Sequence, residues 1–325
     1  MSDLPDGAAV FLGNAGWGNA VAEPLPGDAS FRRYFRIRQD GDTAMLMHAP
    51  PPHEDPEPFL KVGRWLLEHG MRAPAILADD AAQGFILLED FSNDRLRESL
   101  DAADSAAEEA AYAEAVDALI ALQRRGAGPF LPYDLATYMR EVDLFTEWYC
   151  PAMGLEVDTA SWTAAWQEVL EPLLERQKPG VTVLRDYHAE NIMLPPGGGQ
   201  GIIDFQDALV GHRAYDLVSL LQDARRDVAE ELETAMLERY IAAAQPGEHF
   251  HADYARLGAQ RNAKIVGIFS RLNRRDGKPR YLAMIPRVWR LLERDLQHPA
   301  LQPVAGWFAA NIPQFLRDND GGELQ

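Results

Sequence analysis

The chain has 325 residues, with 31 Lys and Arg against 50 Asp and Glu and a formal net charge of −19. Hydrophobic residues make up 47% and charged residues 25%, which are ordinary globular fractions and exclude wholesale disorder. The negative charge argues against a general nucleic-acid binder or a protein that binds anionic membranes. Residues 261–290 differ from the rest, because they carry nine basic residues and one acidic residue and leave −27 for the other 295.

The cysteine content and the N-terminus indicate the compartment. Cys150 is the single cysteine, which excludes an intramolecular disulfide and fits a reducing environment. The first residues lack the basic segment of a signal peptide, and no apolar run approaches the ~18 residues of a membrane-spanning helix. We therefore expect a soluble, cytoplasmic protein without nucleic-acid or membrane partners. The sequence does not determine the oligomeric state.

The first ninety residues predict a small α+β unit with one helix. A helix begins at Asp55-Pro56, carries apolar residues at helical spacing and ends at Gly70. A turn is expected at 27–30, before the second strand. The five expected strands are 19–24, 31–38, 43–48, 75–79 and 84–89.

The rest of the chain predicts helices. A capping box at Ser105 and Glu108 begins a helix whose buried stripe contains Tyr112, Val116 and Leu119. Further helices are expected at 135–149, 159–177, 215–228, 230–244, 254–272 and 281–295. We therefore predict an N-terminal lobe, 1–90, made mainly of strands, and a helical C-terminal lobe, 91–325, with a ligand cleft between them.

One strand pair, between Asn191 and Phe205, interrupts these helices and predicts a cation site. The segments 191–194 and 201–204 flank a Pro- and Gly-rich turn, as in an antiparallel hairpin. Symmetric pairing places Ile192 opposite Ile203 and Asn191 opposite Asp204, so an amide oxygen and a carboxylate converge. Asp186 precedes Asn191 by five residues, and we expect the three side chains to meet. Such oxygen ligands suit Mg²⁺, and a further carboxylate can accept a hydroxyl proton.

The prediction rests on the joint spacing of these residues. A single Asp or Asn beside a strand is a common turn former and carries little information. His188 and Asp207 are further candidates in the same segments, although such residues more often form local hydrogen bonds or lie on the surface.

Several motifs together resemble the aminoglycoside phosphotransferase and choline kinase-like small-molecule kinases. They are GDASFRRYFRI at 27–37, LLEDF at 87–91, LRDYHAEN at 184–191 and IDFQDA at 203–208. Later segments, including GHRAYDL at 211–217 and LGAQRNAK at 257–264, resemble the bacterial amino-sugar kinases that act on N-acetylmuramate and N-acetylglucosamine. The resemblance covers nearly the whole chain and implies the bilobal protein-kinase fold.

The resemblance also implies roles for individual residues. It implies Asp186 as the catalytic base and Asn191 and Asp204 as Mg²⁺ ligands. Asp216 matches an aspartate that supports the catalytic loop. The implied ATP contacts are the 27–31 loop (Gly27, Asp28, Ala29, Ser30 and Phe31) and the hinge (Glu89, Asp90 and Phe91).

Three departures from the family pattern matter. The loop at 27–30 has one glycine where protein kinases have three. Strand 43–47 lacks the lysine that grips the α- and β-phosphates. Arg33 alternates with Phe31, Phe35 and Ile37, and we predict that it points into the cleft and replaces this lysine, with Lys61 as the alternative. Leu184 stands where the family's catalytic loop begins with His.

The basic segment provides candidates for the acceptor site. Arg261 and Lys264 are three residues apart and share a helical face. Because N-acetylmuramate carries a lactyl carboxylate, a kinase for it needs a cation there.

The sequence thus predicts an ATP- and Mg²⁺-dependent kinase that phosphorylates the anomeric hydroxyl of an amino sugar. The resemblance implies a sugar 1-phosphate used in peptidoglycan recycling. Three alternatives remain: another small-molecule kinase of the aminoglycoside or choline type, a catalytically silent nucleotide-binding regulator, and a metal-dependent hydrolase. The missing strand lysine motivates the second, and the Asp and His residues at 186–207 motivate the third.

Overall fold

The computed structural model describes residues 4–26 and 31–323. These residues form two compact units, of which the first comprises Met1–Asp104 and Glu190–Ala208 and the second Ser105–Ala189 and Leu209–Gln325. The hairpin that carries Asn191 and Asp204 thus belongs to the unit formed by the N-terminal strands. The lobes predicted at 1–90 and 91–325 stay a prediction, because compactness alone does not define a functional domain.

The first unit is built on the predicted five-stranded antiparallel sheet, with strand order β1-β2-β3-β5-β4. Phe35 of β2 pairs with Leu46 of β3, which pairs with Leu87 of β5. Because side chains alternate along a strand, these three lie on one face of the sheet. The strands are β1 (Val21–Pro24), β2 (Arg33–Gln39), β3 (Asp42–His48), β4 (Ile76–Asp80) and β5 (Phe85–Glu89).

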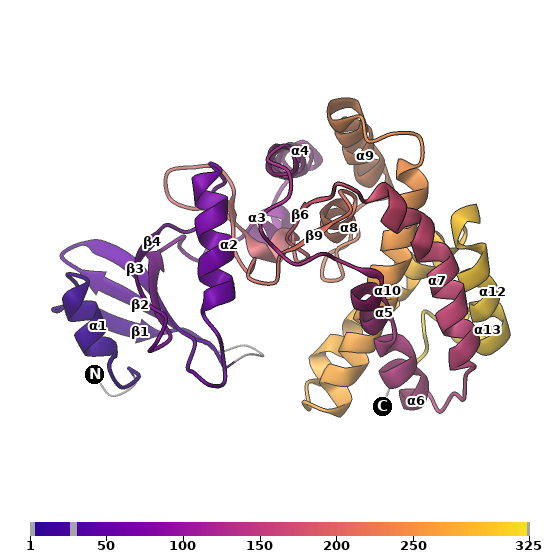
Figure 1. The fold of residues 1–325 in the computed structure, drawn as a ribbon, viewed down its shortest axis with the longest axis horizontal. Coiled ribbons are helices and arrows are strands. Elements are labelled where there is room, and N and C mark those ends of the chain that lie inside the picture. The colour runs from indigo at the N-terminus through magenta and orange to yellow at the C-terminus, as the bar shows by residue number, and fades with distance from the viewer. Residues whose placement is uncertain (1–3, 27–30, 324–325) are drawn as a thin grey trace. The chain divides into compact units, whose positions relative to one another are not determined.

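Two helices lie on opposite sides of this sheet (Figure 1). Helix α1 (Ala8–Asn14) packs Phe11 and Leu12 against the face that carries Phe35, Leu46 and Leu87. The sequence analysis missed this helix, which has only seven residues and no side-chain cap. The predicted helix at 55–70 is α2 (Glu57–Glu68), whose apolar side is buried. A shorter helix, α3 (Leu96–Asp101), follows the sheet.

The predicted hairpin is present as β7 (Ile192–Met193) and β8 (Gly201–Ile202), but its predicted register was wrong by one residue. Ile192 pairs with Ile202 and not with Ile203. The reason lies at the other end of β7, where the N–H of Leu194 donates to the carbonyl of Asp94 at 2.7 Å. Leu194 therefore pairs outside the hairpin, and the connecting loop is one residue longer on that side.

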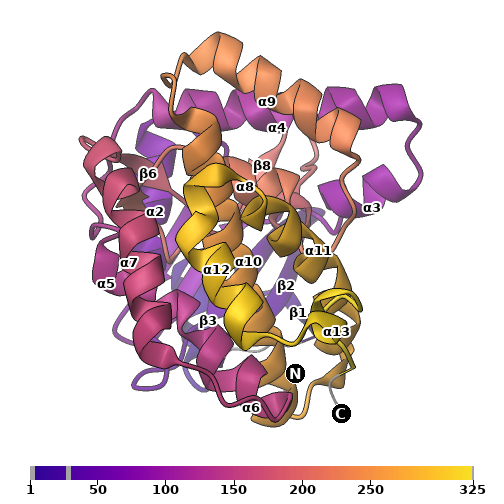
Figure 2. The ribbon, with the colours of Figure 1, turned by 90° about the vertical axis from the view of Figure 1, so that its right-hand side faces the viewer.

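The second unit is mainly helical, and its longest helix is α10. Figure 2 shows α9 beside α4 and α12 beside α7, and both pairs are in contact. The larger helices are α4 (Ser105–Gln123), α5 (Leu135–Val142), α7 (Thr159–Arg176), α8 (Tyr215–Leu221), α9 (Glu230–Ala244), α10 (Phe250–Arg274), α11 (Ile285–Leu296) and α12 (Gln302–Asn311). The shorter ones are η1 (Phe145–Tyr149), α6 (Cys150–Ala152), η2 (Ala189–Asn191, where the chain passes from the second unit to the first), η3 (Pro279–Met284), η4 (Pro299–Leu301) and α13 (Gln314–Arg317).

The core of this unit follows the predicted apolar stripes. Tyr112, Val116 and Leu119 of α4 are buried, as their spacing predicted. Helix α10 packs against η1, α5, α8 and α11. Gly267 permits one of these contacts, because a Cβ there would lie 2.3 Å from the backbone of Leu144. The helix is therefore held close to the segment that follows α5.

Three boundaries differ from the prediction. The helix expected at 135–149 changes to π-helical geometry in η1. The helix expected at 215–228 ends at Leu221, because Gln222 turns away and donates to Asp295 at 3.0 Å. The strand pair β6 (Val181–Val183) and β9 (Leu209–Gly211) was missed, since three-residue strands leave almost no periodicity. Among the described residues, no helix is long and apolar enough to cross a membrane.

Candidate functional site

The open end of the β7–β8 hairpin brings Asn191 and Asp204 together, as predicted. The amide nitrogen of Asn191 lies 3.4 Å from one carboxylate oxygen of Asp204, and the other oxygen accepts a hydrogen bond from Gln206 at 2.9 Å. Asp204 is exposed, and its φ of +60° lies in the left-handed region. Rotation of the Asn191 amide presents its oxygen beside the carboxylate. This accessible oxygen pair suits Mg²⁺, which takes one or two protein carboxylates or carbonyls and keeps its waters.

The sequence analysis missed a group of residues beside Asp204. Burial raises the pKa of Tyr34; the charge of Arg32 lowers it and that of Asp204 raises it, so the phenol lies near both. The Arg32 guanidinium lies 3.5 Å from the carboxylate of Glu54. The other oxygen of Glu54 accepts a hydrogen bond from the N–H of Phe31 at 3.2 Å. Glu54 therefore holds the start of β2 and the Arg32 side chain together.

The two predicted replacements for the strand lysine occupy different places. Arg33 does share a face of β2 with Phe35, but α1 covers that face, and the Arg33 guanidinium lies 5.0 Å from the Phe35 ring centroid. Lys61 is on the exposed side of α2. Arg32 and Tyr34 alternate with Arg33 and lie on the opposite face. The sequence shows the alternation, but not which of the two faces α1 covers.

The predicted phosphate loop is only partly described. Gly27, Asp28, Ala29 and Ser30 lie outside the described residues. Phe31 is 66% exposed, and its ring stacks on His53 with a centroid distance of 5.4 Å.

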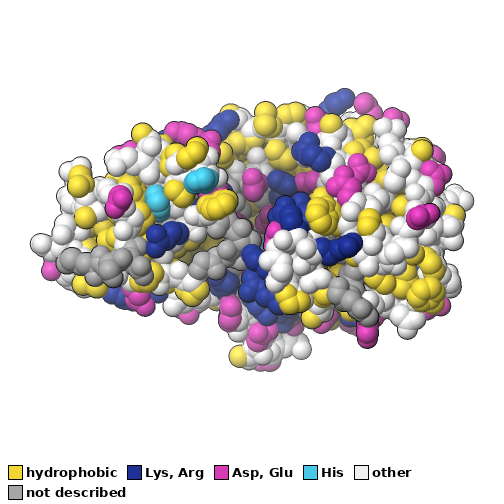
Figure 3. Space-filling model, turned by 90° about the horizontal axis from the view of Figure 1, so that it is seen from below, with side chains coloured by type: hydrophobic (Ala, Val, Ile, Leu, Met, Phe, Trp, Pro, Cys, Tyr) yellow, Lys and Arg dark blue, Asp and Glu magenta, His cyan; other side chains and the backbone are white. Residues whose placement is uncertain are grey.

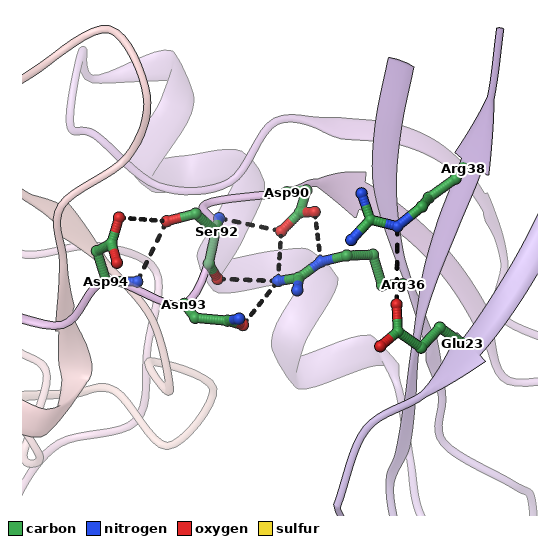
Figure 4. A network of polar contacts seen from close by, with 7 residues as sticks. All are labelled: Glu23, Arg36, Arg38, Asp90, Ser92, Asn93 and Asp94. Carbon is green, nitrogen blue, oxygen red and sulfur yellow. Dashed lines mark hydrogen bonds and ion pairs between the residues drawn. The ribbon is translucent and has the colours of Figure 1, made fainter. Parts of the chain in front are cut away.

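The predicted hinge is fixed by two ion pairs. Glu89 accepts two hydrogen bonds from Arg72, at 2.6 and 2.7 Å. Asp90 accepts two from Arg36, at 2.7 and 3.1 Å, and the same guanidinium donates to Asn93 and to the carbonyl of Ser92. Figure 4 shows this network beside the more exposed pair of Arg38 and Glu23. The two hinge carboxylates thus hold the segment in place, which leaves backbone groups as its means of binding a ligand.

Phe91 anchors the end of the hinge. It is buried, and the Arg72 guanidinium lies 4.4 Å from its ring centroid. A Cβ at position 201 would lie 2.4 Å from this ring, so Gly201 of β8 allows the close approach.

The loop that carries Asp186 is supported by Asp216, as predicted. The two carboxylate oxygens of Asp216 accept hydrogen bonds from the N–H groups of Leu184 and Arg185, at 2.7 and 2.8 Å. Arg185 has φ of +74°, so these bonds hold a left-handed conformation just before Asp186. Burial raises the pKa of Asp216 to about 7, while the two backbone hydrogen bonds lower it and the charge of Asp186 raises it.

Positive charges keep Asp186 ionised. Asp186 is exposed to solvent as a residue. Protein atoms packed around its carboxyl nevertheless remove water from the charged form, and this burial acts to raise the pKa of Asp186. The positive charges of Lys264, Arg261 and Arg185 oppose that effect, as His188 does in its protonated form, and the pKa is lowered. At neutral pH the carboxylate is therefore ready to accept a proton. Its predicted meeting with Asn191 and Asp204 stays a prediction.

Lys264 belongs to a buried ionic cluster that surrounds Glu141. Its ammonium lies 3.0 Å from the Glu141 carboxylate and 3.3 Å from the Tyr215 hydroxyl. Arg185 and the Tyr133 hydroxyl donate hydrogen bonds to the same carboxylate. Burial acts to raise the pKa of Glu141, but Lys264 and Arg185 lower it. The carboxylate therefore stays charged and orients both cations.

The other predicted substrate residues differ in how exposed they are. Arg261 is only 2% exposed, and its charge lowers the pKa of both Asp186 and Asp216. His188 is buried and receives a hydrogen bond from Arg225 at 3.2 Å; burial lowers its pKa to about 4, so it is neutral at pH 7. Asp207 is exposed. The substrate roles predicted for these three residues stay predictions.

A family model and curated relatives identify the class of protein. The model of the phosphotransferase enzyme family matches residues 21–259. The chain belongs to this family. It is 35% identical to a protein of Caulobacter vibrioides, with 94% of this chain and 96% of that protein aligned, and 38% identical to one of Pseudomonas aeruginosa, with 92% and 91% aligned. Both are named N-acetylmuramate/N-acetylglucosamine kinase.

Solved structures show the same kinase-like fold at low sequence identity. Aminoglycoside phosphotransferase APH(2'')-Ib, with ADP bound, is 14% identical with a TM-score of 0.59, and covers 89% of this chain and 97% of its own. Choline kinase LicA from Streptococcus pneumoniae is 13% identical with a TM-score of 0.58, over 84% and 94%. A choline/ethanolamine kinase family protein from Mesorhizobium loti is 16% identical with a TM-score of 0.61, over 92% and 98%. The predicted fold class is confirmed.

Proposed function

We propose that the protein transfers the γ-phosphoryl group of ATP to the anomeric hydroxyl of an amino sugar, N-acetylmuramate or N-acetylglucosamine. The alignment of more than nine-tenths of the chain with kinases of that name carries the proposal. The product is the sugar 1-phosphate, and its use in cell-wall recycling in the cytoplasm is part of the proposal.

Asp186 is the base in this reaction. The sugar oxygen forms a bond to the γ-phosphorus while the bond to the β,γ-bridging oxygen breaks, and ADP leaves. The hydroxyl proton passes to the Asp186 carboxylate, whose lowered pKa keeps it ionised beforehand. Asp216 holds the backbone on the N-terminal side of Asp186 and so fixes the position of the base. Most of the acceleration in such transfers comes from positioning and charge neutralisation.

Asn191 and Asp204 hold the metal in this proposal. A Mg²⁺ ion held there would supply positive charge beside the phosphates of ATP. Arg32 is the cation that we assign in place of the strand lysine, because it directly precedes β2 and its charge acts on Tyr34, which also feels the charge of Asp204. Its pair with Glu54 orients the guanidinium. The adenine ring binds backbone groups of Glu89, Asp90 and Phe91, since both hinge carboxylates are engaged by arginines.

A phosphorus NMR spectrum tests the reaction. The protein is incubated with ATP, Mg²⁺ and each amino sugar in turn, and we expect a sugar phosphate resonance coupled to the anomeric proton. Asp186→Asn should abolish this resonance and still bind nucleotide, whereas Asp318→Asn, at an exposed carboxyl of the same unit, should not. A wild-type protein that binds ATP and phosphorylates neither sugar would instead support the silent regulator or another acceptor.

Two neighbouring substitutions test the assignment of the cation. Arg32→Met should lower kcat/KM for ATP by about 100-fold, through a higher KM and a lower kcat. This is the usual scale for the loss of one charged contact to a transferring group. Arg33→Met, on the opposite face of the same strand, is the matched control and should change kcat/KM by less than threefold. The reverse order of effects would restore Arg33 as the phosphate ligand.

A further inference from the structure

A cavity of about 640 Å³ lies within the helical unit, at the junction of α5 and α10. Its volume falls in the range of small-molecule sites, and leucine, proline and isoleucine side chains form its apolar part. On the α10 side, Lys264, Ile268 and Arg271 line it; they recur at helical spacing and so share one face. On the α5 side, Arg140 and Glu141 line it.

The inner end of this cavity, lined by Lys264 and Arg185, lies next to the proposed catalytic base along the chain, because Arg185 directly precedes Asp186. Lys264 and Arg185 both line the cavity, and the charges of both lower the pKa of Asp186. Both are paired with Glu141, at 3.0 Å in the case of Lys264, and its single negative charge balances one of the two positive charges. The N–H groups that these two cations direct at Glu141 are therefore committed to that carboxylate.

The outer end carries cations of a different kind. Arg271 lies seven residues beyond Lys264, which is ~10 Å along a helix. Among the described residues no carboxylate lies within 4.0 Å of Arg271, and its buried Nε has no hydrogen-bond partner. Burial lowers the pKa of Arg271, and the charge of Arg275 acts in the same direction, whereas the charges of Asp276 and Glu147 act to raise it. Arg140, on the facing helix, is exposed and likewise has no ion pair within the described part of the chain.

Such a cation on the wall of a cavity favours an anionic ligand. A partly buried arginine without a partner is costly, and a carboxylate that accepts its paired N–H groups removes that cost. The protein as a whole carries −19, so this local positive charge is not a general property of its surface. Figure 3 shows one face on which Lys and Arg side chains gather in local clusters among scattered Asp and Glu.

We propose that this cavity binds the acceptor sugar and that Arg271, assisted by Arg140, binds the carboxylate of an acidic amino sugar. This inference rests on the proposed kinase activity and adds the determinant of substrate selectivity. The sugar lies along α10, with its reacting hydroxyl at the Lys264 end and its acidic substituent at the Arg271 end. N-acetylmuramate uses both ends, whereas N-acetylglucosamine, which has no carboxylate, uses only the first.

The experiment compares the two sugars in the same variants. In Arg271→Gln, the ratio of KM for N-acetylmuramate to KM for N-acetylglucosamine should rise about tenfold or more, the change expected for the loss of a hydrogen-bonded charge pair. Arg271→Lys keeps the charge and should retain most of the selectivity. Arg274→Gln, on the same helix but exposed and outside the cavity lining, is the control and should leave the ratio within twofold. An unchanged ratio in Arg271→Gln, or an equal change in the control, overturns the proposal.

Calorimetric titration of each sugar without nucleotide separates this inference from the proposed activity. If the wild type binds N-acetylmuramate but phosphorylates neither sugar, the proposed reaction fails. The Kd ratio in Arg271→Gln then decides the inference about the cavity. If the wild type neither binds nor phosphorylates either sugar, both proposals are overturned. Thermal melting of Arg271→Gln and Arg271→Lys confirms that the variants are folded.

Discussion

Replacement of Asp216 tests how the loop before Asp186 is held. The carboxylate accepts hydrogen bonds from two backbone N–H groups, those of Leu184 and Arg185. Each buried donor that loses its acceptor costs about 1–3 kcal/mol. Asp216→Ala should therefore lower the free energy of unfolding by about 2–6 kcal/mol. Asp216→Asn keeps one acceptor oxygen but points an N–H toward the other donor, and we expect a loss of about 1–3 kcal/mol.

The effect on turnover should exceed the effect on nucleotide binding. A displacement of Asp186 by ~1 Å is enough to lower kcat about 100-fold, because proton transfer requires close positioning. Urea denaturation gives the stability and steady-state kinetics give kcat, and Asp318→Asn serves as an exposed control within about 0.5 kcal/mol of the wild type. An Asp216→Ala variant with the wild-type urea midpoint and the wild-type kcat would refute the supporting role of this carboxylate.

Three further predictions concern metal binding, pH and the hinge. Asp204→Asn should lower kcat about 100-fold and remove most of the effect of Mg²⁺ on the affinity for ATP. Titration of ATP with and without Mg²⁺ measures this effect, and an undiminished effect in the variant would exclude Asp204 as a ligand. Burial raises the pKa of Asp295 to about 8, so its contribution to stability is complete below pH ~4 and is lost as pH rises to about 8. The difference in unfolding free energy between wild type and Asp295→Asn should fall by up to about 1.4 kcal/mol per pH unit between pH 5 and 8, and parallel curves would contradict this. Arg36→Met removes the ion-pair partner of the buried Asp90 carboxylate and should lower the free energy of unfolding by about 3–5 kcal/mol, measured by thermal melting. Arg38→Met, in an exposed pair, should lower it by less than about 1 kcal/mol. Similar losses in the two variants would show that burial is not the cause.

The sheet, most helices and one pair of site residues were predictable from local patterns. Alternating side chains identified the five strands, and the stripe of α4 identified its buried face. The convergence of Asn191 and Asp204 survived an error of one residue in the hairpin register. The open end is shifted as well, because the N–H of Ile203 donates to the carbonyl of Asn191 at 3.0 Å. The convergence survived because Asp204 is the next residue and turns with a φ of +60°, so that its carboxylate still lies 3.4 Å from the Asn191 amide. Short elements such as α1 and β6 were not predicted, because they contain too few residues for the alternation of apolar and polar side chains to show a period.

The sequence by itself determined the chemistry that is present: the Asp186 and Asn191 spacing, the absence of a lysine in β3 and the concentration of basic residues in 261–290. Only the tertiary structure decided which of these groups are available. It placed Arg261 in a buried position and engaged Lys264 with Glu141, and it left Arg271 on the wall of a cavity. The physical reason is that a charge is committed or available according to its partners, and those partners come from segments far apart in the sequence.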